Sequence, residues 1–150
     1  MSAHEAQDPE FESRVRRSFD RQQFMTTLGA TLARVAPGEV DIELRTREAL
    51  TQQHGFLHAG ALASIADSAC GYAALSLMPP GAAVLSIEFK INMLAPAAGD
   101  RVLARGRVIR AGKTITVCWG EVIAHDGDRE RTVATMVATM MTVRDRGIAD

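Results

Sequence analysis

The segment from His58 to Met78 restricts the fold of this chain more than any other feature. It reads HAGALASIADSACGYAALSLM, and Asp67 is the only carboxylate within it. Pro79-Pro80-Gly81 follows directly, so we expect one long helix that ends there. A helix that is apolar on nearly all sides is stable in water only when the rest of the chain surrounds it. Within such a helix an ionised carboxylate is unfavourable unless something compensates it, so Asp67 needs an explanation.

The composition predicts one globular domain in which such a helix can be buried. The chain has 150 residues, of which 47% are hydrophobic and 23% charged, enough for a sizeable core. The helix is long enough for a membrane span, but its Ala, Gly and Ser content and the central Asp67 favour a buried helix instead. The formal net charge is −1 and the arginines are spread along the chain, so we expect neither a nucleic acid nor a membrane as partner.

The N-terminus and the cysteines predict a cytoplasmic location. The N-terminal sequence MSAHEAQDPEFESRVRR is polar and charged and lacks the apolar core of a signal peptide. Cys70 and Cys118 lie in apolar stretches, without the spacing of a disulfide framework or a metal site. We expect both thiols to be reduced residues of the core.

Before the long helix, the pattern predicts a shorter helix and two strands. Residues 1–9 are expected to form a flexible tail. From Glu10 to Leu28, apolar residues recur at roughly helical spacing, which is typical of an amphipathic helix. Strands are expected over Thr31–Ala36 and Val40–Thr46, separated by a Pro-Gly turn.

After the long helix, four strands follow one another. Leu85 to Met93 alternates strictly, with apolar residues on one face and Ser86 among the polar residues of the other. Further strands are expected over Val102–Arg110, Lys113–Ala124 and Thr132–Val143.

Consecutive strands joined by tight turns pair antiparallel, and a sheet of this kind can wrap around an apolar helix. The sequence therefore predicts an α+β fold, the hotdog fold, in which a curved antiparallel sheet surrounds a long central helix. We expect residues 10–150 to form this single domain, with the N-terminal helix as part of it.

Asp67 is the first candidate for chemistry. On a helix it shares a stripe with small residues, namely Gly60, Ala63, Ser64, Cys70, Gly71 and Ala74. A second chain or a thin ligand could approach this face closely. Asp67 is then either one polar residue in a packing surface or a general base or nucleophile in a narrow cleft.

The start of the same helix is the second candidate. His58 and Ala59 stand there, where unpaired N–H groups and the helix dipole can hold a carbonyl oxygen that gains negative charge. His54 and His58 are four residues apart, but no further ligand is near, so we expect no metal. The sequence has no G-x-S-x-G, G-x-G-x-x-G or Walker A motif, so we expect neither a serine hydrolase nor a bound cofactor.

Two stretches of the sequence resemble a known family. His54-Gly55-Phe56-Leu57-His58-Ala59-Gly60-Ala61, followed by Ala66-Asp67-Ser68-Ala69, resembles the HG-x-x-HGG-A…AD-x-A signature of PaaI-type hotdog-fold acyl-CoA thioesterases. The segments Ser86–Pro96 and Arg110–Lys113 are also similar to that family, and the resemblance extends from about Leu28 to Val143. It implies that the protein hydrolyses an acyl-CoA thioester to the free acid and CoA.

The resemblance also implies roles for individual residues. Asp67 is the catalytic carboxylate, acting on water as a general base or on the thioester as a nucleophile. The backbone N–H of Ala59 is the oxyanion donor, and Ser86 positions water. Gln52 contacts the region of the thioester carbonyl, although the adjacent Gln53 could take that place instead.

The remaining motif residues are expected to bind the substrate. His54, Gly55, His58 and Gly60 surround the helix start, where His58 shapes the turn, and Arg110 and Lys113 on a hairpin are candidates for the CoA phosphates. Ala59 stands where the family has Gly, which adds a methyl group where the backbone approaches the substrate.

In this family the active site forms between two subunits, so the resemblance implies a homodimer with shared sites, and pairs of such dimers as tetramers. Two alternatives to thioester hydrolysis are known for this fold. Hotdog hydratases need a His five residues from the Asp, where this chain has Tyr72. A non-catalytic acyl-CoA-binding or sensing module of the same fold remains open. The identity of the acyl group does not follow from the sequence.

Overall fold

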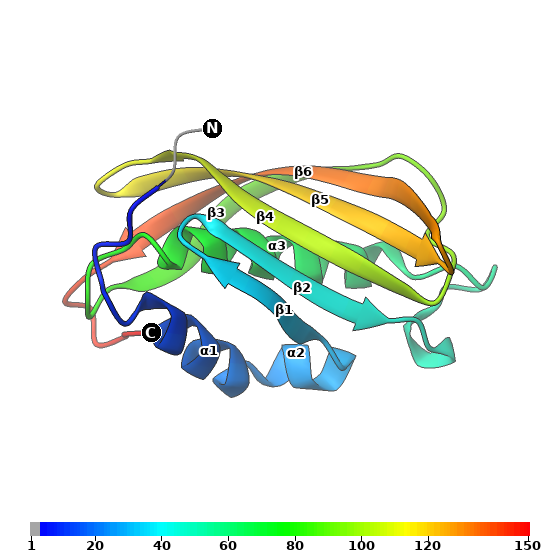
Figure 1. Ribbon diagram of the computed structural model, residues 1–150, viewed down its shortest axis with the longest axis horizontal. Helices are drawn as coiled ribbons and strands as arrows, with labels where there is room; N and C mark the ends of the chain where they lie inside the picture. The colour runs from blue at the N-terminus through cyan, green and yellow to red at the C-terminus, as the bar shows by residue number, and fades with distance from the viewer. Residues whose placement is uncertain (1–3) are drawn as a thin grey trace.

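Residues 4–150 are described by a computed structural model, in which one six-stranded antiparallel sheet wraps around a long helix (Figure 1). The order of strands across the sheet is β1-β2-β4-β5-β6-β3. The helices are α1 (Phe11–Arg21), α2 (Gln23–Leu28) and α3 (Ala59–Leu75), with a 3-10 turn at Glu48–Leu50. The strands are β1 (Thr31–Ala36), β2 (Glu39–Arg45), β3 (Ala83–Met93), β4 (Arg101–Ala111), β5 (Ile115–Asp126) and β6 (Arg129–Val143). The predicted α+β hotdog architecture is confirmed.

The long helix α3 lies directly against the backbone of β4 and β5. At Gly106 a Cβ atom would be 2.3 Å from the carbonyl group of Ala69, and at Gly120 it would be 3.0 Å from the sulfur of Cys70. A Cβ atom would be excluded at Gly106 and crowded at Gly120, so glycine on the strands allows the close approach of α3. No helix within residues 4–150 has both the length and the apolar character needed to cross a membrane.

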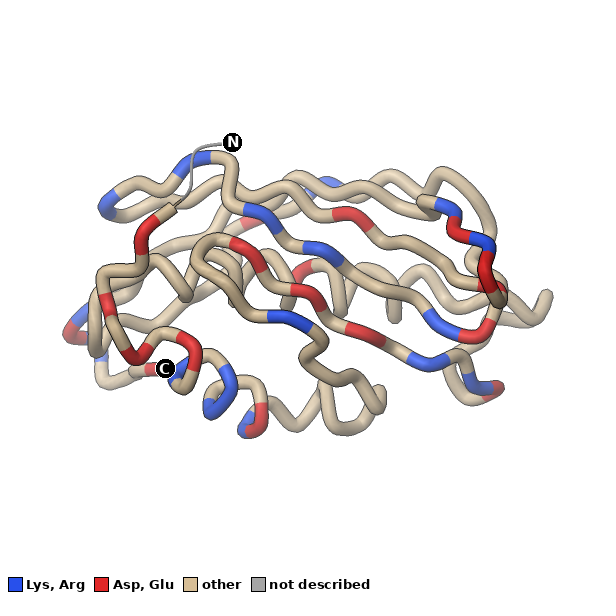
Figure 2. The backbone as a smooth tube through the Cα atoms, viewed as in Figure 1, with Lys and Arg blue, Asp and Glu red and all other residues tan. Residues whose placement is uncertain are grey.

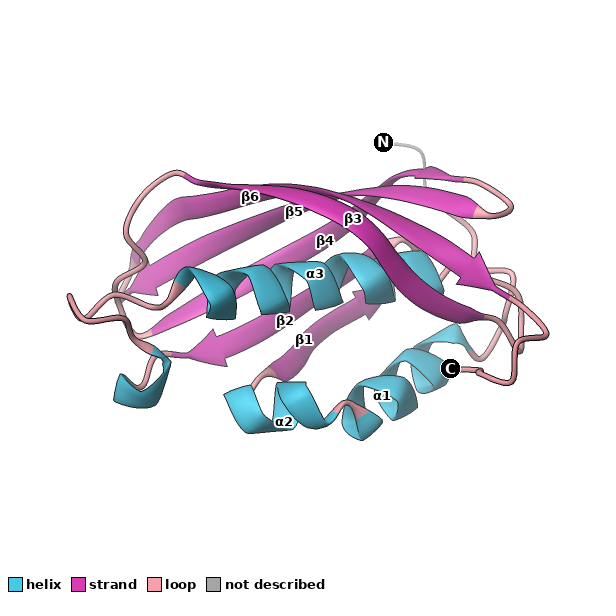
Figure 3. Cartoon of the chain, turned by 180° about the vertical axis from the view of Figure 1, so that it is seen from behind, coloured by secondary structure: helices cyan, strands magenta, loops and turns pink. Residues whose placement is uncertain are grey.

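One side of α3 is left uncovered by the sheet (Figure 3). The residues of α3 that keep some solvent exposure are Ala59, Gly60, Ala63, Ser64 and Asp67. They recur at intervals of three or four positions and therefore form one stripe. This stripe is the N-terminal part of the small-residue face predicted around Asp67, and the part beyond Asp67 is buried.

The predicted helix over Glu10–Leu28 is broken into two. Gln22 has extended backbone angles (φ −79°, ψ 95°) and separates α1 from α2. The second helix then ends at Gly29, whose φ of 78° is the left-handed conformation that glycine adopts easily. The amphipathic pattern continues through the break, so the sequence does not reveal it.

A buried arginine joins α1 to the end of α3. Arg14 is only 3% exposed, and its guanidinium donates hydrogen bonds to the carbonyl groups of Leu75 (2.8 Å), Met78 (3.0 Å) and Pro79 (2.9 Å). It also forms a 3.0 Å ion pair with Asp8. Carbonyl groups at a helix C-terminus have no partner within the helix, so Arg14 supplies the missing donors.

Side chains of residues 4–9, within the stretch predicted to be a flexible tail, contact the rest of the domain. Residues 1–3 lie outside the described residues. His4 bonds the carbonyl of Val108 at 3.1 Å, and Gln7 donates to the carbonyl of Leu77 at 2.9 Å. These polar side chains satisfy carbonyl groups of β4 and of the segment after α3, contacts that the local sequence does not indicate.

A β-bulge in the edge strand β3 reverses the direction in which its side chains alternate. Ser86 pairs with Met140 and Glu88 with Thr139, so Ile87 has no partner and forms a β-bulge. Because side chains alternate along a strand, one extra residue reverses which of them point inward. The prediction that Ser86 points away from the apolar side is therefore wrong: Ser86 lies on the same face as the buried Met140.

Opposite charges face each other on neighbouring strands (Figure 2). Arg107 of β4 pairs with Asp41 of β2 at 2.7 Å, and Arg101 approaches Glu43 at 3.7 Å. Two arginines of β4, Arg101 and Arg107, are thus paired with carboxylates of the neighbouring strand.

Candidate active site

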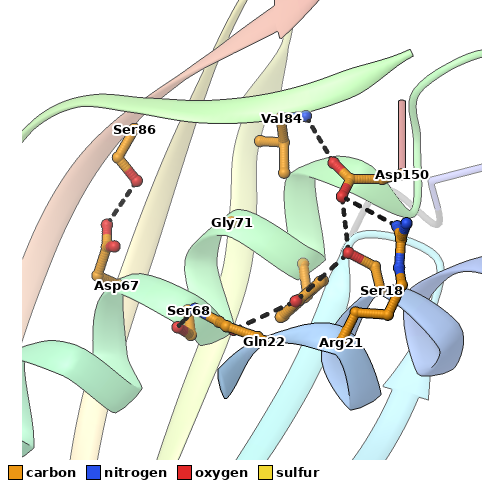
Figure 4. Close-up of a pocket in the computed structure, with 10 residues that line it drawn as sticks. Ser18, Arg21, Gln22, Asp67, Ser68, Gly71, Val84, Ser86 and Asp150 are labelled. Carbon is orange, nitrogen blue, oxygen red and sulfur yellow. Dashed lines mark hydrogen bonds and ion pairs between the residues drawn. The ribbon is translucent and has the colours of Figure 1, made fainter. Parts of the chain in front are cut away.

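Asp67 and Ser86 meet on the inner side of the sheet (Figure 4). The Ser86 hydroxyl donates a 2.7 Å hydrogen bond to Oδ1 of Asp67 and lies 3.3 Å from the sulfur of Met140. The bulge at Ile87 produces this contact, since without it Ser86 would point to the outer face of the sheet. The structure therefore brings together two of the predicted site residues, one from α3 and one from β3.

The surroundings of Asp67 make its carboxylate a stronger base. Burial raises the pKa of Asp67 above its usual value, while the hydrogen bond from Ser86 acts in the opposite direction. A carboxylate that binds a proton more readily than usual is suited to accept one from water.

A cavity of about 330 Å³ adjoins this pair. Its lining comes from the α1–α2 junction, α3, the start of β3 and the end of the chain, and comprises Ser18, Arg21, Gln22, Asp67, Ser68, Gly71, Tyr72, Val84, Ser86 and Asp150. Sequence reasoning identified only Asp67 and Ser86 among these as site residues. Gln22 and Ser18 come from a helix that reads as an ordinary amphipathic one, so no local signal marks them.

The start of α3 has a free backbone donor. His58 is the N-cap: its Nδ1 accepts a 2.8 Å hydrogen bond from the N–H of Gly60, while its carbonyl accepts from Ala61 and Leu62. Among the hydrogen bonds of residues 4–150, none uses the N–H of Ala59. This N–H stands at the positive end of the helix dipole, which favours an oxygen that carries negative charge.

The turn before α3 forms a second cavity, of about 530 Å³. Gln52, His54 and Ala59 line it together with apolar residues of the loop, α3 and the end of β3. The side-chain oxygen of Gln52 accepts a hydrogen bond from the N–H of His54, and Gly55 turns the chain with a φ of 85°. Gln53 is exposed and is not part of this lining.

The two halves of the predicted site are separate within one chain. Asp67 stands eight residues after Ala59 on α3, which places them about 12 Å apart along the helix axis. One thioester carbonyl cannot contact both.

The hairpin residues Arg110 and Lys113 lie at the other end of the sheet. Lys113 lines a cavity there with Met78 and Pro79, which follow α3.

No three His, Cys, Asp or Glu side chains converge as a metal site within the described part of the chain. The motif residue Gly60 leaves room for the ring of His58. A Cβ atom at position 60 would be 3.0 Å from Nδ1 of His58. The functional groups that the structure presents are the Asp67 carboxylate, the Ser86 hydroxyl and the backbone N–H of Ala59.

Comparison with known proteins identifies relatives of this chain. A model of the thioesterase superfamily matches residues 54–131. A crystal structure of a thioesterase family protein from Silicibacter pomeroyi is 48% identical, covers 89% of this chain and 98% of its own, and superposes with a TM-score of 0.88. Human acyl-coenzyme A thioesterase 13 is 32% identical over 63% of this chain and 68% of its own length. The E. coli PaaI protein has the same fold, with a TM-score of 0.81 at 22% identity over 92% of this chain and 96% of its own.

Proposed function

Because the chain belongs to the thioesterase superfamily, we propose that it hydrolyses an acyl-CoA thioester to the free carboxylic acid and CoA. The observation that carries this proposal is the Asp67–Ser86 hydrogen bond beside a cavity on the uncovered side of α3. The name of the human relative, acyl-coenzyme A thioesterase 13, supports CoA as the thiol.

In the proposed reaction, a water molecule beside Asp67 attacks the thioester carbon. Asp67 accepts the proton of this water, and Ser86, which already donates to Asp67, orients the water through its oxygen. The carbon–sulfur bond then breaks and the CoA thiolate takes up the proton. In the nucleophilic variant of this scheme, Asp67 itself attacks the carbon and water hydrolyses the resulting anhydride.

The oxyanion is bound by the N–H of Ala59 from a second subunit. Within one chain Ala59 is too far from Asp67, and the N–H has no partner in the described structure, which supports a site shared between two chains. Gln52 and His54 line the cavity at the same helix start and would contact the substrate there with Gly55, His58 and Gly60.

The edge strand β3 supports a homodimer as the working unit. Among residues 4–150 no strand other than β6 pairs with it, and on the segment beyond Val84, whose N–H donates to Asp150, the other edge is open to a further strand. Phe89 and Met93, on its inner face, are 46% and 42% exposed, which is unusual for apolar residues beside a core. Pairing of two such strands would cover these residues and bring the start of one α3 toward the Asp67 of the other. Tetramers of two dimers remain a prediction.

Substitution of Ala59 by proline tests the backbone donor directly. Ala59 is the first residue of α3, a position that favours proline, and His58 before it has extended angles (φ −64°, ψ 137°) that proline also requires. The variant should therefore fold with its helix intact but lack the N–H. We expect kcat to fall about a hundredfold, measured as thiol release from acyl-CoA.

Mixing this variant with Asp67→Asn tests whether the site is shared. Each variant alone has two defective sites in its dimer. After joint refolding, half the dimers are mixed, and each regains one intact site, so about a quarter of the wild-type activity should return. If Asp67 and Ala59 act within one chain, mixing restores nothing.

The pH dependence tests the role of Ser86. Activity needs ionised Asp67, so kcat/KM should rise as the pH passes the pKa of Asp67, which burial has raised. Ser86→Ala removes the hydrogen bond that opposes this rise, so we expect the acidic limb of the profile to move to higher pH. Ser86→Thr keeps the hydroxyl and should leave the limb where it is. An unchanged limb in Ser86→Ala would contradict the assignment.

A panel of acyl-CoA esters with short, long and aromatic acyl groups tests the reaction itself, with free thiol as the measured product. Hydrolysis of at least one ester supports the proposal. Binding of the esters without thiol release from any of them would favour the non-catalytic acyl-CoA-binding module instead.

A further inference from the structure

We propose that the cavity beside Asp67 receives the acyl group and selects acyl groups with a hydrogen-bond acceptor, such as a hydroxyl or oxo oxygen, toward their far end. The inference rests on the proposed function, because it assumes that Asp67 acts at the thioester carbon. It adds a substrate class and the residues that determine it.

The cavity begins at the reacting pair and continues along α3 (Figure 4). Asp67 and Ser86 stand at one end, and Ser18, Arg21 and Asp150 at the other. Gly71 lies one helical turn beyond Asp67, and a Cβ atom built on it would meet nothing within 4 Å. The cavity is thus open beside Gly71, which leaves room for an acyl chain.

The wall of the cavity contains a connected set of polar groups. The hydroxyl of Tyr72 donates to Oε1 of Gln22 at 3.2 Å, and its oxygen lies 3.4 Å from the hydroxyl oxygen of Ser18. The Gln22 amide nitrogen donates to the hydroxyl of Ser68 at 3.3 Å. The Ser18 hydroxyl also approaches Asp150 at 2.7 Å. The network therefore holds the Gln22 side chain against the cavity.

Two donors of this network remain unused. Gln22 has a second amide hydrogen, and the hydroxyl hydrogen of Ser68 has no acceptor among the described residues. Ser68 is only 8% exposed, so water solvates it poorly. Both groups have a hydrogen to donate, and one acceptor atom of a ligand could pair with both.

An unsubstituted alkyl chain in this cavity would leave these donors without partners. Enclosing polar groups without a hydrogen-bond partner is unfavourable, which is how a polar pocket rejects a ligand that lacks the matching group. The break between α1 and α2 occurs at Gln22, so the backbone departs from the helix at the residue whose amide lines the cavity.

The test compares hexanoyl-CoA with 6-hydroxyhexanoyl-CoA, by kcat/KM from thiol release. For the wild type we expect the hydroxylated ester to be preferred about three- to tenfold, the effect of one hydrogen bond. Gln22→Leu and Ser68→Ala should each reduce this preference toward one. Ser68→Ala keeps a residue that favours helix and so guards against loss of folding. Gln23→Leu, the same change at the adjacent exposed position, is the matched control and should retain the preference.

Substitution of Gly71 tests the path of the acyl chain. Gly71→Val adds a side chain where the cavity is open, and we expect the ratio of kcat/KM for hexanoyl-CoA to that for acetyl-CoA to fall about tenfold or more. Unchanged ratios in Gly71→Val, or equal hydrolysis of the two hexanoyl esters by the wild type, would overturn the inference and leave the proposed function intact. Absence of thiol release from every ester would overturn both.

Discussion

Asp67→Asn is expected to lower kcat/KM for acyl-CoA hydrolysis by a factor of about 10²–10⁴, the usual contribution of a general base or nucleophile. Asparagine has the same shape and can still accept the hydrogen bond from Ser86. It cannot take a proton from water at neutral pH. The measurement is thiol release under saturating and subsaturating substrate.

The stability of the same variant should move in the opposite direction. Burial raises the pKa of Asp67, so its ionised form is less favourable in the folded than in the unfolded protein. Its contribution to stability is therefore greatest at low pH and is lost as the pH rises through the folded-state pKa. We expect Asp67→Asn to keep or raise Tm at pH 7.

Asp20→Asn, at an exposed position of α1, is the control for both properties and should change neither. Near wild-type activity in Asp67→Asn would remove Asp67 from the mechanism. A loss of activity accompanied by a large fall in Tm would instead indicate that Asp67 is a structural residue.

Arg14→Leu is expected to reduce the free energy of unfolding by about 3–5 kcal/mol, the effect of breaking a buried ion pair. The substitution leaves Asp8 buried without its partner. It also removes the donors to three carbonyl groups, one at the last residue of α3 and two just after it. Leucine fills part of the volume but supplies no hydrogen bond. Denaturant unfolding with circular dichroism measures the change.

Arg16 gives a matched control on the same helix. It pairs with Glu12 at 2.8 Å on the exposed side of α1, with both side chains about half exposed (48% and 52%). Arg16→Leu should cost about 0.5 kcal/mol or less, as exposed pairs one turn apart usually do. Equal effects of the two substitutions would mean that Arg14 does not hold α1 to α3.

The elements of this fold could be predicted because their signals are local. The apolar segment of α3 and the alternation in the later strands follow from the periodicity of a few neighbouring residues. Asp67 was identifiable because a single carboxylate in an apolar helix is rare. The N-cap role of His58 agrees with its predicted place in the turn.

The features that sequence reasoning missed depend on residues far apart in the chain. The donors of Arg14 reach carbonyl groups more than sixty residues away, and Gln22 meets Tyr72 across fifty positions. Nothing in the neighbourhood of either residue indicates these partners. The separation of Asp67 from Ala59, by contrast, agrees with the expectation from the family resemblance that two subunits share the site.

The bulge at Ile87 has a consequence for assigning functions to relatives by alignment. A single inserted or deleted residue in β3 decides whether the hydroxyl at position 86 meets Asp67 or points to the outer surface. A homologue with serine in the same alignment column but a strand one residue shorter would therefore lack this contact. Gap placement in β3, more than residue identity, determines whether the role of Ser86 can be transferred between proteins.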